Sequence, residues 1–191
     1  MKDTRNEIIN IACDLIRSVG YNAFSYADIS KKLNIKNAAI HYYFPTKGDL
    51  GVEAIRRNQS AFEKITSLWK ELSYSQQLAN YIKMHDSFIN KGWVCIVGSL
   101  SPSYDTLPEN MKSELQKLIN TIIDWLSDVL ERGKDSGEFR LEGTAKDQAY
   151  AIHSAMLSAL LMNKVLKNDV YKLIQNNLLM QVSIKTITNK E

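Results

Sequence analysis

Apolar residues recur at helical spacing along almost the whole chain. Over residues 4–19 they fall at every third or fourth position, at Ile8, Ile11, Ala12, Leu15, Ile16 and Val19, which is typical of an amphipathic helix with one buried face. The spacing continues over residues 47–91, with a break near Leu72, and returns over 109–132, 144–166 and 170–188. Since no segment has a convincing strand pattern, the sequence predicts an all-α fold.

Four pairs of residues mark where helices are expected to begin. In each pair a serine or threonine precedes an acidic residue by three positions, as in a capping box: Thr4–Glu7, Ser25–Asp28, Thr46–Asp49 and Thr144–Asp147. Gly20 is placed to end the first helix, because glycine adopts positive φ at low cost. Gly133 and Gly137 are expected to end the helix over 109–132, and residues 92–108 are expected to form a loop with a short helix.

Residues 25–44 have the pattern of a helix-turn-helix, in which two short helices cross at a steep angle with a tight turn between them. Ser30 is small enough for the crossing. Asn34 stands at the turn, where asparagine adopts the left-handed conformation at low cost. Four apolar residues are spaced to hold the two helices together: Ile29, Leu33, Ile35 and Ile40. The second helix is expected over residues 37–43.

The outward face of that second helix is unusual for a core element. It carries Asn37, Ala38, His41 and Tyr42, with Lys36 just before it. Small residues let a helix enter the major groove, asparagine hydrogen-bonds base edges, and tyrosine or histidine donates to phosphate oxygens. On the pattern alone, the alternative is a structural helical hairpin whose aromatic residues only pack.

Positive charge is concentrated near the N-terminus. Residues 1–57 contain nine basic and six acidic side chains, which accounts for the whole net charge of +3, whereas the rest of the 191-residue chain has 15 of each. A locally basic segment on a neutral body fits contact with nucleic acid. An excess this small also fits an ordinary solvated surface.

Composition and motifs argue against several classes of protein. No apolar run approaches the ~18 residues of a membrane span, and the N-terminus lacks a secretory signal, so we expect a cytoplasmic protein. Cys13 and Cys95 lie far apart with no histidine at ligand spacing, so we expect no disulfide framework, metal or cofactor. The chain lacks a nucleophile–base motif, a phosphate loop, an HExxH sequence and paired carboxylates, which argues against an enzyme.

The stretch Ala38–Leu50, AAIHYYFPTKGDL, resembles the signature of the TetR family of transcriptional regulators. Upstream residues match the first two helices of that family: Ile9, Ala12, Gly20, Phe24, Ser25, Asp28 and Ile29. The resemblance is specific over residues 5–55 and looser beyond. There are departures: His41 stands where the family usually has tyrosine, Asn34 replaces the turn glycine, and Ser30 replaces a small alanine.

The resemblance implies a homodimeric regulator that binds a palindromic double-stranded operator and is released by a small-molecule effector. It implies a helix-turn-helix domain of three helices at residues 1–46 and a larger helical regulatory and dimerisation domain at 47–191. The expected DNA contacts are Ser25, Tyr26, Lys36, Asn37, Ala38, Ala39, His41, Tyr42, Tyr43 and Lys47. A non-catalytic helical interaction module that keeps the fold without specific DNA binding is the alternative function.

The resemblance also implies that the last two helices pair with their copies in a partner subunit. The apolar residues that fit this role are Ile152, Ala155, Met156, Ala159, Leu160 and Leu166 in one helix and Val170, Ile174, Leu178, Val182 and Ile187 in the other. Apolar periodicity reports burial but not what covers the face, so the same residues equally fit the core of a single subunit.

The effector site is expected in the larger domain, where aromatic residues and a few polar groups make suitable pocket walls. The preferred candidates are Phe88, Trp93, Trp125 and His153. Each is individually more typical of ordinary core packing. Cys95 is either a sensor of oxidants or, as favoured by the usual burial of unpaired cysteine, an inert thiol.

Overall fold

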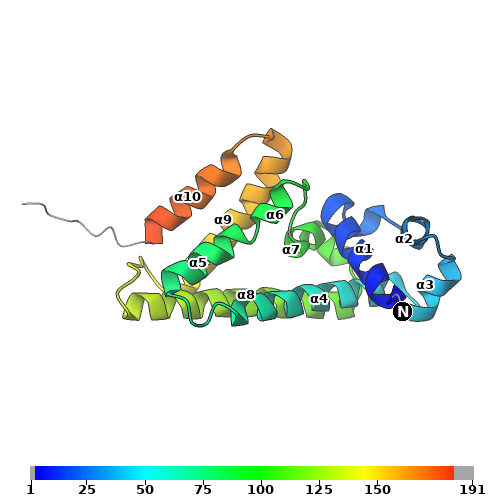
Figure 1. Cartoon of the computed structure of the whole chain (residues 1–191), viewed down its shortest axis with the longest axis horizontal. Helices are drawn as coiled ribbons and strands as arrows, with labels where there is room; N and C mark the ends of the chain where they lie inside the picture. Colours follow the sequence, from blue (N-terminus) through cyan, green and yellow to red (C-terminus); the bar gives the residue numbers. More distant parts are fainter. Residues whose placement is uncertain (1–2, 183–191) are drawn as a thin grey trace, which may run out of the picture. The chain divides into compact units, whose positions relative to one another are not determined.

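The computed structural model describes residues 3–182, whose regular elements are helical (Figure 1). The α-helices are α1 (Thr4–Val19), α2 (Tyr26–Leu33), α3 (Asn37–Tyr43), α4 (Lys47–Ser67), α5 (Tyr74–Lys83), α6 (Asp86–Ile89), α7 (Ile96–Leu100), α8 (Glu109–Asp135), α9 (Ala145–Leu166) and α10 (Val170–Val182). Two 3-10 helices, η1 (Tyr21–Ala23) and η2 (Ser101–Thr106), lie between them. The described residues contain no strand, so the prediction of an all-α fold is confirmed.

The chain divides into two compact units. Among the described residues, the first unit comprises residues 3–64 together with Gly92–Thr121, and the second comprises Ile65–Lys91 together with residues 122–182. Helices α4 and α8 each begin in the first unit and end in the second. These packing units are a different division from the predicted boundary after residue 46, which stays a prediction.

In the first unit, α1 packs on α2 and α7, and α2 packs on α3 (Figure 1). The apolar stripe predicted for α1 forms the centre of this core, because Ile8 and Ile16 are completely buried. Ile29 and Ile40 are buried to the same degree and join α2 to α3, as the helix-turn-helix pattern predicts. Burial of such an aliphatic side chain contributes roughly 1.5–3 kcal/mol, so this cluster fixes the relative placement of the first three helices.

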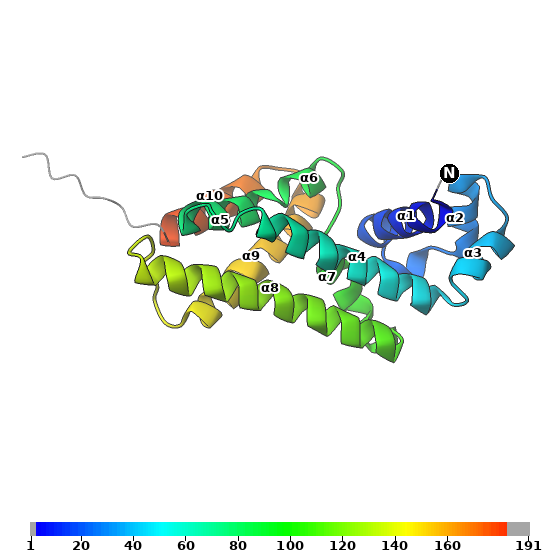
Figure 2. The same ribbon diagram turned by 60° about the horizontal axis from the view of Figure 1, so that its bottom comes forward.

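In the second unit, α9 and α10 pack side by side, while α6 contacts α9 and α5 contacts α10 (Figure 2). Tyr171 on α10 is buried and its hydroxyl lies 2.8 Å from Oδ1 of Asp86 and 3.2 Å from the carbonyl oxygen of Ile82. These acceptors come from segments almost 90 residues earlier in the chain. They anchor the last described helix to α5 and α6.

The predicted bounds of the first helix, residues 4–19, are confirmed, but its predicted capping residue and one predicted end of a later helix are wrong. The cap of α1 is Asp3 rather than Thr4, since the Asp3 side chain accepts a hydrogen bond from the backbone N–H of Asn6 at 3.2 Å. Gly133 does not end α8 but lies inside it, where an added Cβ atom would lie only 2.2 Å from the ring of Phe139. Gly137, at φ 80°, follows the helix as predicted.

The predicted role of several α9 and α10 residues in subunit pairing is also wrong. The residues of that set that are buried within the single chain are Ile152, Met156, Ala159, Leu160 and Leu178. The alternative, a core role, therefore holds for these five. The helix expected over 170–188 is described as far as Val182, and Ile187 lies outside the described residues.

Candidate nucleic-acid interface

The start of α2 is fixed by the predicted Ser25–Asp28 capping box. The backbone N–H and the hydroxyl of Ser25 both donate to Oδ2 of Asp28, at 2.7 and 2.8 Å. These hydrogen bonds favour the carboxylate and lower the pKa of Asp28. Ser25 itself remains exposed at the surface.

The turn between α2 and α3 has the predicted left-handed residue. Asn34 has φ 54° and ψ 46°, a region that non-glycine residues other than Asn and Asp seldom adopt. Ser30 stands one turn before it and its carbonyl oxygen accepts from the N–H of Ile35 at 3.1 Å. The chain then enters α3 at Asn37, the residue at which the sequence predicts the second helix to begin.

Helix α3 buries one side and exposes the other. Ile40 is completely buried, whereas Asn37, Ala38 and His41 are exposed and Tyr42 is 81% exposed. An aromatic ring that is this exposed in the single chain is available for contact with a partner. The exposed side therefore combines small residues, an amide and hydrogen-bonding rings on a single short helix.

Tyr43 and Lys36 extend this exposed surface at the two ends of α3. Tyr43 is 38% exposed and its ring meets that of Tyr42 edge to face, with centroids 5.1 Å apart. Lys36 is exposed just before the first turn of the helix, and Ala39 is half-buried. The structure thus brings together Lys36, Asn37, Ala38, His41, Tyr42 and Tyr43, as the sequence predicts.

Tyr26 differs from the other predicted DNA contacts because its side chain is buried. Its hydroxyl donates to the carbonyl oxygen of Phe44 at 2.9 Å, and its ring centroid lies 4.7 Å from that of His41. Burial raises the pKa of Tyr26 to about 12. The Nδ1 atom of His41 lies 3.3 Å from the carbonyl oxygen of Pro45, which can only accept, so Nδ1 carries the hydrogen in this contact.

Lys47, at the start of α4, is half-buried. Its ammonium donates to the carbonyl oxygen of Phe24 and lies 4.2 and 4.7 Å from the ring centroids of Phe24 and Tyr21. Desolvation lowers the pKa of Lys47. The helix start is capped as predicted, since Thr46 and Asp49 exchange hydrogen bonds between backbone and side chain.

Three of the four predicted effector residues belong to an aromatic cluster in the second unit. The hydroxyl of Tyr81 lies 2.7 Å from Nδ1 of His153, and its ring centroid lies 5.7 Å from that of Trp125. His85 links Tyr81 to Phe88, with centroid separations of 5.6 and 6.0 Å. Tyr81 connects the predicted residues but was not singled out by sequence, because helical spacing does not distinguish it from core.

The histidines of the aromatic cluster are uncharged near neutral pH. Burial lowers the pKa of His85 to about 4, and it also lowers the pKa of His153. The Nε2 atom of His153 is buried and has no hydrogen-bond partner among the described residues. Buried polar atoms are normally paired, so His153 differs in this respect from an ordinary core histidine.

Trp93 and Cys95 lie in the first unit instead. The guanidinium of Arg17 lies 5.8 Å from the ring centroid of Trp93. The Sγ atom of Cys95 accepts from the backbone N–H of Gly98 at 3.4 Å, and burial raises the pKa of its thiol. A raised pKa disfavours the reactive thiolate, which supports an inert role for Cys95.

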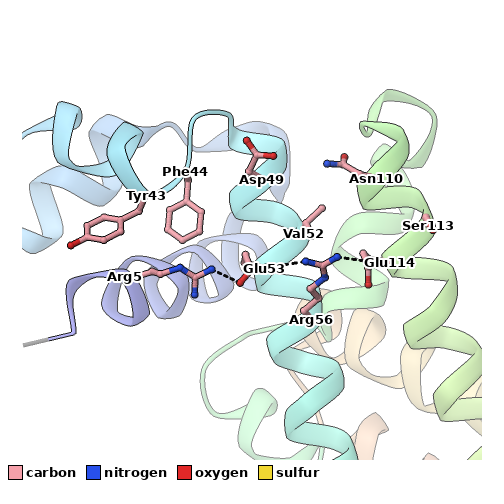
Figure 3. A pocket seen from close by; sticks show the side chains of 10 residues that line it. All are labelled: Arg5, Tyr43, Phe44, Asp49, Val52, Glu53, Arg56, Asn110, Ser113 and Glu114. Carbon is pink, nitrogen blue, oxygen red and sulfur yellow. Dashed lines mark hydrogen bonds and ion pairs between the residues drawn. The ribbon is translucent and has the colours of Figure 1, made fainter.

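A pocket of about 450 Å³ in the first unit was not found by sequence reasoning (Figure 3). Its lining includes Tyr43 and Phe44, at the end of the exposed helix, together with Arg5, Glu53 and Arg56. The other charged residues of the lining are Asp49 on α4 and Glu114 on α8. These charged side chains come from α1, α4 and α8, so neither spacing nor a local motif could have connected them.

Comparisons with known proteins agree with this geometry. Residues 8–54 match the family model described as "Bacterial regulatory proteins, tetR family", and residues 75–172 match "Tetracyclin repressor-like, C-terminal domain". The chain belongs to the TetR family. The prediction of the family from residues 38–50 is therefore confirmed, and this TetR-family chain is a DNA-binding transcriptional regulator.

Individual relatives of this TetR-family chain include a repressor. The chain is 24% identical over 173 residues to the HTH-type transcriptional repressor NemR of Escherichia coli, a match that covers 85% of each protein. A TetR-family regulator from Agrobacterium tumefaciens has a TM-score of 0.90 with 28% identity, covering 96% of this chain and 99% of that one. A TetR regulator from Legionella pneumophila has a TM-score of 0.87 with 25% identity, covering 96% and 99%.

Two further features are absent from the described residues. None of the helices within residues 3–182 is long and apolar enough to cross a membrane. Over the same residues, no three or more His, Cys, Asp or Glu side chains are grouped in a way that would hold a metal ion.

Proposed function

We propose that this protein is a transcriptional repressor that binds a palindromic operator as a homodimer and leaves it when a small molecule binds the larger domain. The observation that carries the proposal is the exposed side of α3, where Tyr42 is 81% exposed beside Asn37, Ala38 and His41. In a symmetric dimer, two such helices occupy major grooves about 34–36 Å apart, one helical turn of the duplex.

The proposed contacts divide into base readers and phosphate contacts. Asn37 reads a base edge through its amide, and Ala38 and Ala39 let the backbone approach the groove. The side chains that contact phosphate oxygens are Lys36, His41, Tyr42 and Tyr43. Ser25 and Tyr26 contribute through the first turn of α2, whose leading N–H groups have no partner within the helix. Lys47 acts from the corresponding turn of α4.

An apolar face on α9 and α10 supports the proposed dimer. Its exposed residues in the single chain are Tyr150, Leu161, Met162, Val165, Leu166, Leu173 and Met180. Tyr150, Leu161 and Val165 share one stripe of α9, with the exposed Ser154 and Ser158 between them. A stripe with large apolar and small residues is suited to close packing against a second helix pair.

The aromatic cluster of the second unit supports the proposed effector site, with Phe88, Trp125 and His153 as its contacts. Trp93 belongs to the first unit and remains a separate proposed contact. The proposed domains remain residues 1–46 for reading DNA and 47–191 for the effector and the dimer. An effector weakens DNA binding only through its preference for the arrangement of the dimer that does not fit the operator.

The deciding experiment is a binding titration of the full chain with a duplex recovered from a random-sequence library by selection against this protein. We expect an inverted repeat, and an affinity that falls with salt at a slope of about −0.9 for each phosphate contact. Recovery of no preferred duplex, with binding that does not respond to salt, would instead support the interaction module without specific DNA binding.

A further inference from the structure

A chain of ion pairs connects three helices of the first unit (Figure 3). Arg5 on α1 pairs with Glu53 on α4 at 2.5 Å, and Glu53 also pairs with Arg56 at 3.2 Å. Arg56 in turn pairs with Glu114 on α8 at 3.0 Å. Two carboxylates and two guanidinium groups thus alternate from α1 to α8.

The α8 end of this chain is the most buried part. The side chain of Glu114 is 11% exposed, and it accepts hydrogen bonds from both Arg56 and Lys117 at 3.0 Å. These two hydrogen bonds lower the pKa of Glu114, so it stays ionised at neutral pH. A buried carboxylate with two cationic partners is more sensitive to loss of a partner than an exposed ion pair.

The α1 end of the chain reaches the helix that the proposed function assigns to DNA. The Arg5 guanidinium lies 5.3 Å from the ring centroid of Phe44, the residue that ends α3. Phe44 is buried, and its carbonyl oxygen accepts from Tyr26. The ion-pair chain therefore ends on the segment that orients both α2 and α3.

A second and independent contact joins α4 to the beginning of α8. A Cβ atom on Gly51 would lie 2.5 Å from Sδ of Met111, and one on Gly48 would lie 3.1 Å from Cγ of Pro108. The two glycines thus let α4 approach this segment closely, one to two turns before Arg56 meets Glu114. Apolar contact and ion pair together fix α4 against α8 over the part of each helix in the first unit.

We infer that Glu114 is a positioning residue for DNA binding, which it supports through Arg56, Glu53 and Arg5 rather than by touching the duplex. This inference rests on the proposed function of α3. Helices α4 and α8 continue without a break into the second unit, where Trp69 and Trp125 lie with ring centroids 5.9 Å apart. The Glu114–Arg56 ion pair thus joins α8 to α4 beside the apolar contact, and Glu53 and Arg5 extend that connection to α1 and the end of α3.

Glu114→Gln tests this role, because a positioning role and simple electrostatics predict opposite changes in DNA affinity. Loss of a carboxylate makes the protein more positive, which by itself strengthens binding to DNA. We expect the selected duplex to bind E114Q roughly three- to thirtyfold more weakly than the wild type, with an unchanged salt slope. The matched control is Glu109→Gln, which removes the same charge from α8 at a side chain that is 88% exposed, and it should bind at least as well as wild type.

Arg56→Gln and the double variant R56Q/E114Q separate positioning from direct contact. If Arg56 acts through Glu114, the double variant should bind the duplex no more weakly than whichever single variant binds it less well, because both changes break the same contact. Additive losses, or a salt slope that falls by about one for R56Q, would mean that Arg56 touches phosphate and would overturn the inference. Urea unfolding of each variant identifies any that fails to fold. If E114Q fails to fold, Glu114→Asp replaces it, and we again expect weaker binding to the selected duplex than for the wild type.

The wild-type titration distinguishes the two levels of the argument. If the wild type binds no duplex, the proposed function fails. If the wild type binds its duplex and both E114Q and E109Q bind it equally well, the proposed function stands and the positioning role of Glu114 is refuted.

Discussion

The hydroxyl of Tyr26 donates to the carbonyl oxygen of Phe44 at 2.9 Å, so the first residue of α2 is tied to the residue that ends α3. This contact joins the two helices at the end opposite to their turn at Asn34. The helix-turn-helix is therefore closed at both ends, by a left-handed residue at one and a buried side-chain hydrogen bond at the other.

Removal of that hydroxyl tests how far this closure stabilises the fold. Tyr26→Phe keeps the buried ring and loses one hydrogen bond, so we expect the free energy of unfolding to fall by about 1 kcal/mol in a urea titration. The matched control is Tyr42→Phe, which removes a hydroxyl from a ring that is 81% exposed and should leave stability unchanged. Equal stability of Y26F and wild type would show that the contact contributes nothing net.

The turn residue offers a test of backbone conformation. Asn34→Ala places a residue with no local hydrogen-bonding side chain at φ 54°, and we expect a loss of about 1 kcal/mol in the free energy of unfolding. Asn34→Gly adopts the same φ without a steric cost, so its free energy of unfolding should differ from that of the wild type by only about a few tenths of a kcal/mol. A ranking in which alanine is as stable as glycine would contradict the left-handed turn.

Local features of this region were predictable because they depend on neighbouring residues. The limits of α3, the left-handed Asn34 and the Ser25–Asp28 capping box each follow from spacing within one or two turns. The ion pairs of Arg5 with Glu53 and of Arg56 with Glu114 join residues 48 and 58 positions apart, so no local pattern reveals them. Gly133 misled prediction for a related reason: its small size accommodates Phe139 and does not end a helix.

Base reading and phosphate contact should separate in two variants of the proposed interface. Asn37→Ala removes the only side-chain amide of α3, so we expect a relaxed sequence preference with a salt slope near that of wild type. Lys36→Ala should weaken binding to all duplexes alike and reduce the salt slope by about one. Selecting preferred duplexes for each variant and titrating them with salt measures both effects. If N37A keeps the sequence preference of the wild type, Asn37 does not read a base.

Lys47 is expected to differ from Lys36, because its ammonium also has partners inside the protein. Lys47→Ala should flatten the salt slope as K36A does, and it should in addition lower the free energy of unfolding by about 1 kcal/mol, since the donor to the Phe24 carbonyl is lost. Urea titrations of K47A and K36A at one salt concentration provide the comparison. Equal stability of the two variants would mean that the Phe24 contact has no net value.

The buried His85 predicts a loss of stability in mild acid. Its pKa is lowered to about 4 in the folded protein, against about 6.5 when unfolded, so the unfolded chain binds the proton more readily. Stability is therefore full above pH 6.5 and falls as the pH drops from there toward 4, by about 2 kcal/mol between pH 7 and pH 5. Urea titrations across this range should show that the free energy of unfolding of the wild type depends on pH, and that this dependence is reduced in His85→Gln. Parallel curves for the two proteins would exclude His85 as the source of the pH dependence.

The apolar face of α9 and α10 predicts the outcome of a single charge placed within it. Val165 is 78% exposed in the single chain, so Val165→Glu should not disturb folding of a subunit. A carboxylate buried between two copies without a partner is strongly unfavourable, and we expect V165E to be monomeric at concentrations where wild type is a dimer. Leu68→Glu is the matched control, because Leu68 is 72% exposed and lies outside both helices. Light scattering during size-exclusion chromatography gives the mass of each; a dimeric V165E would exclude this face as the subunit interface.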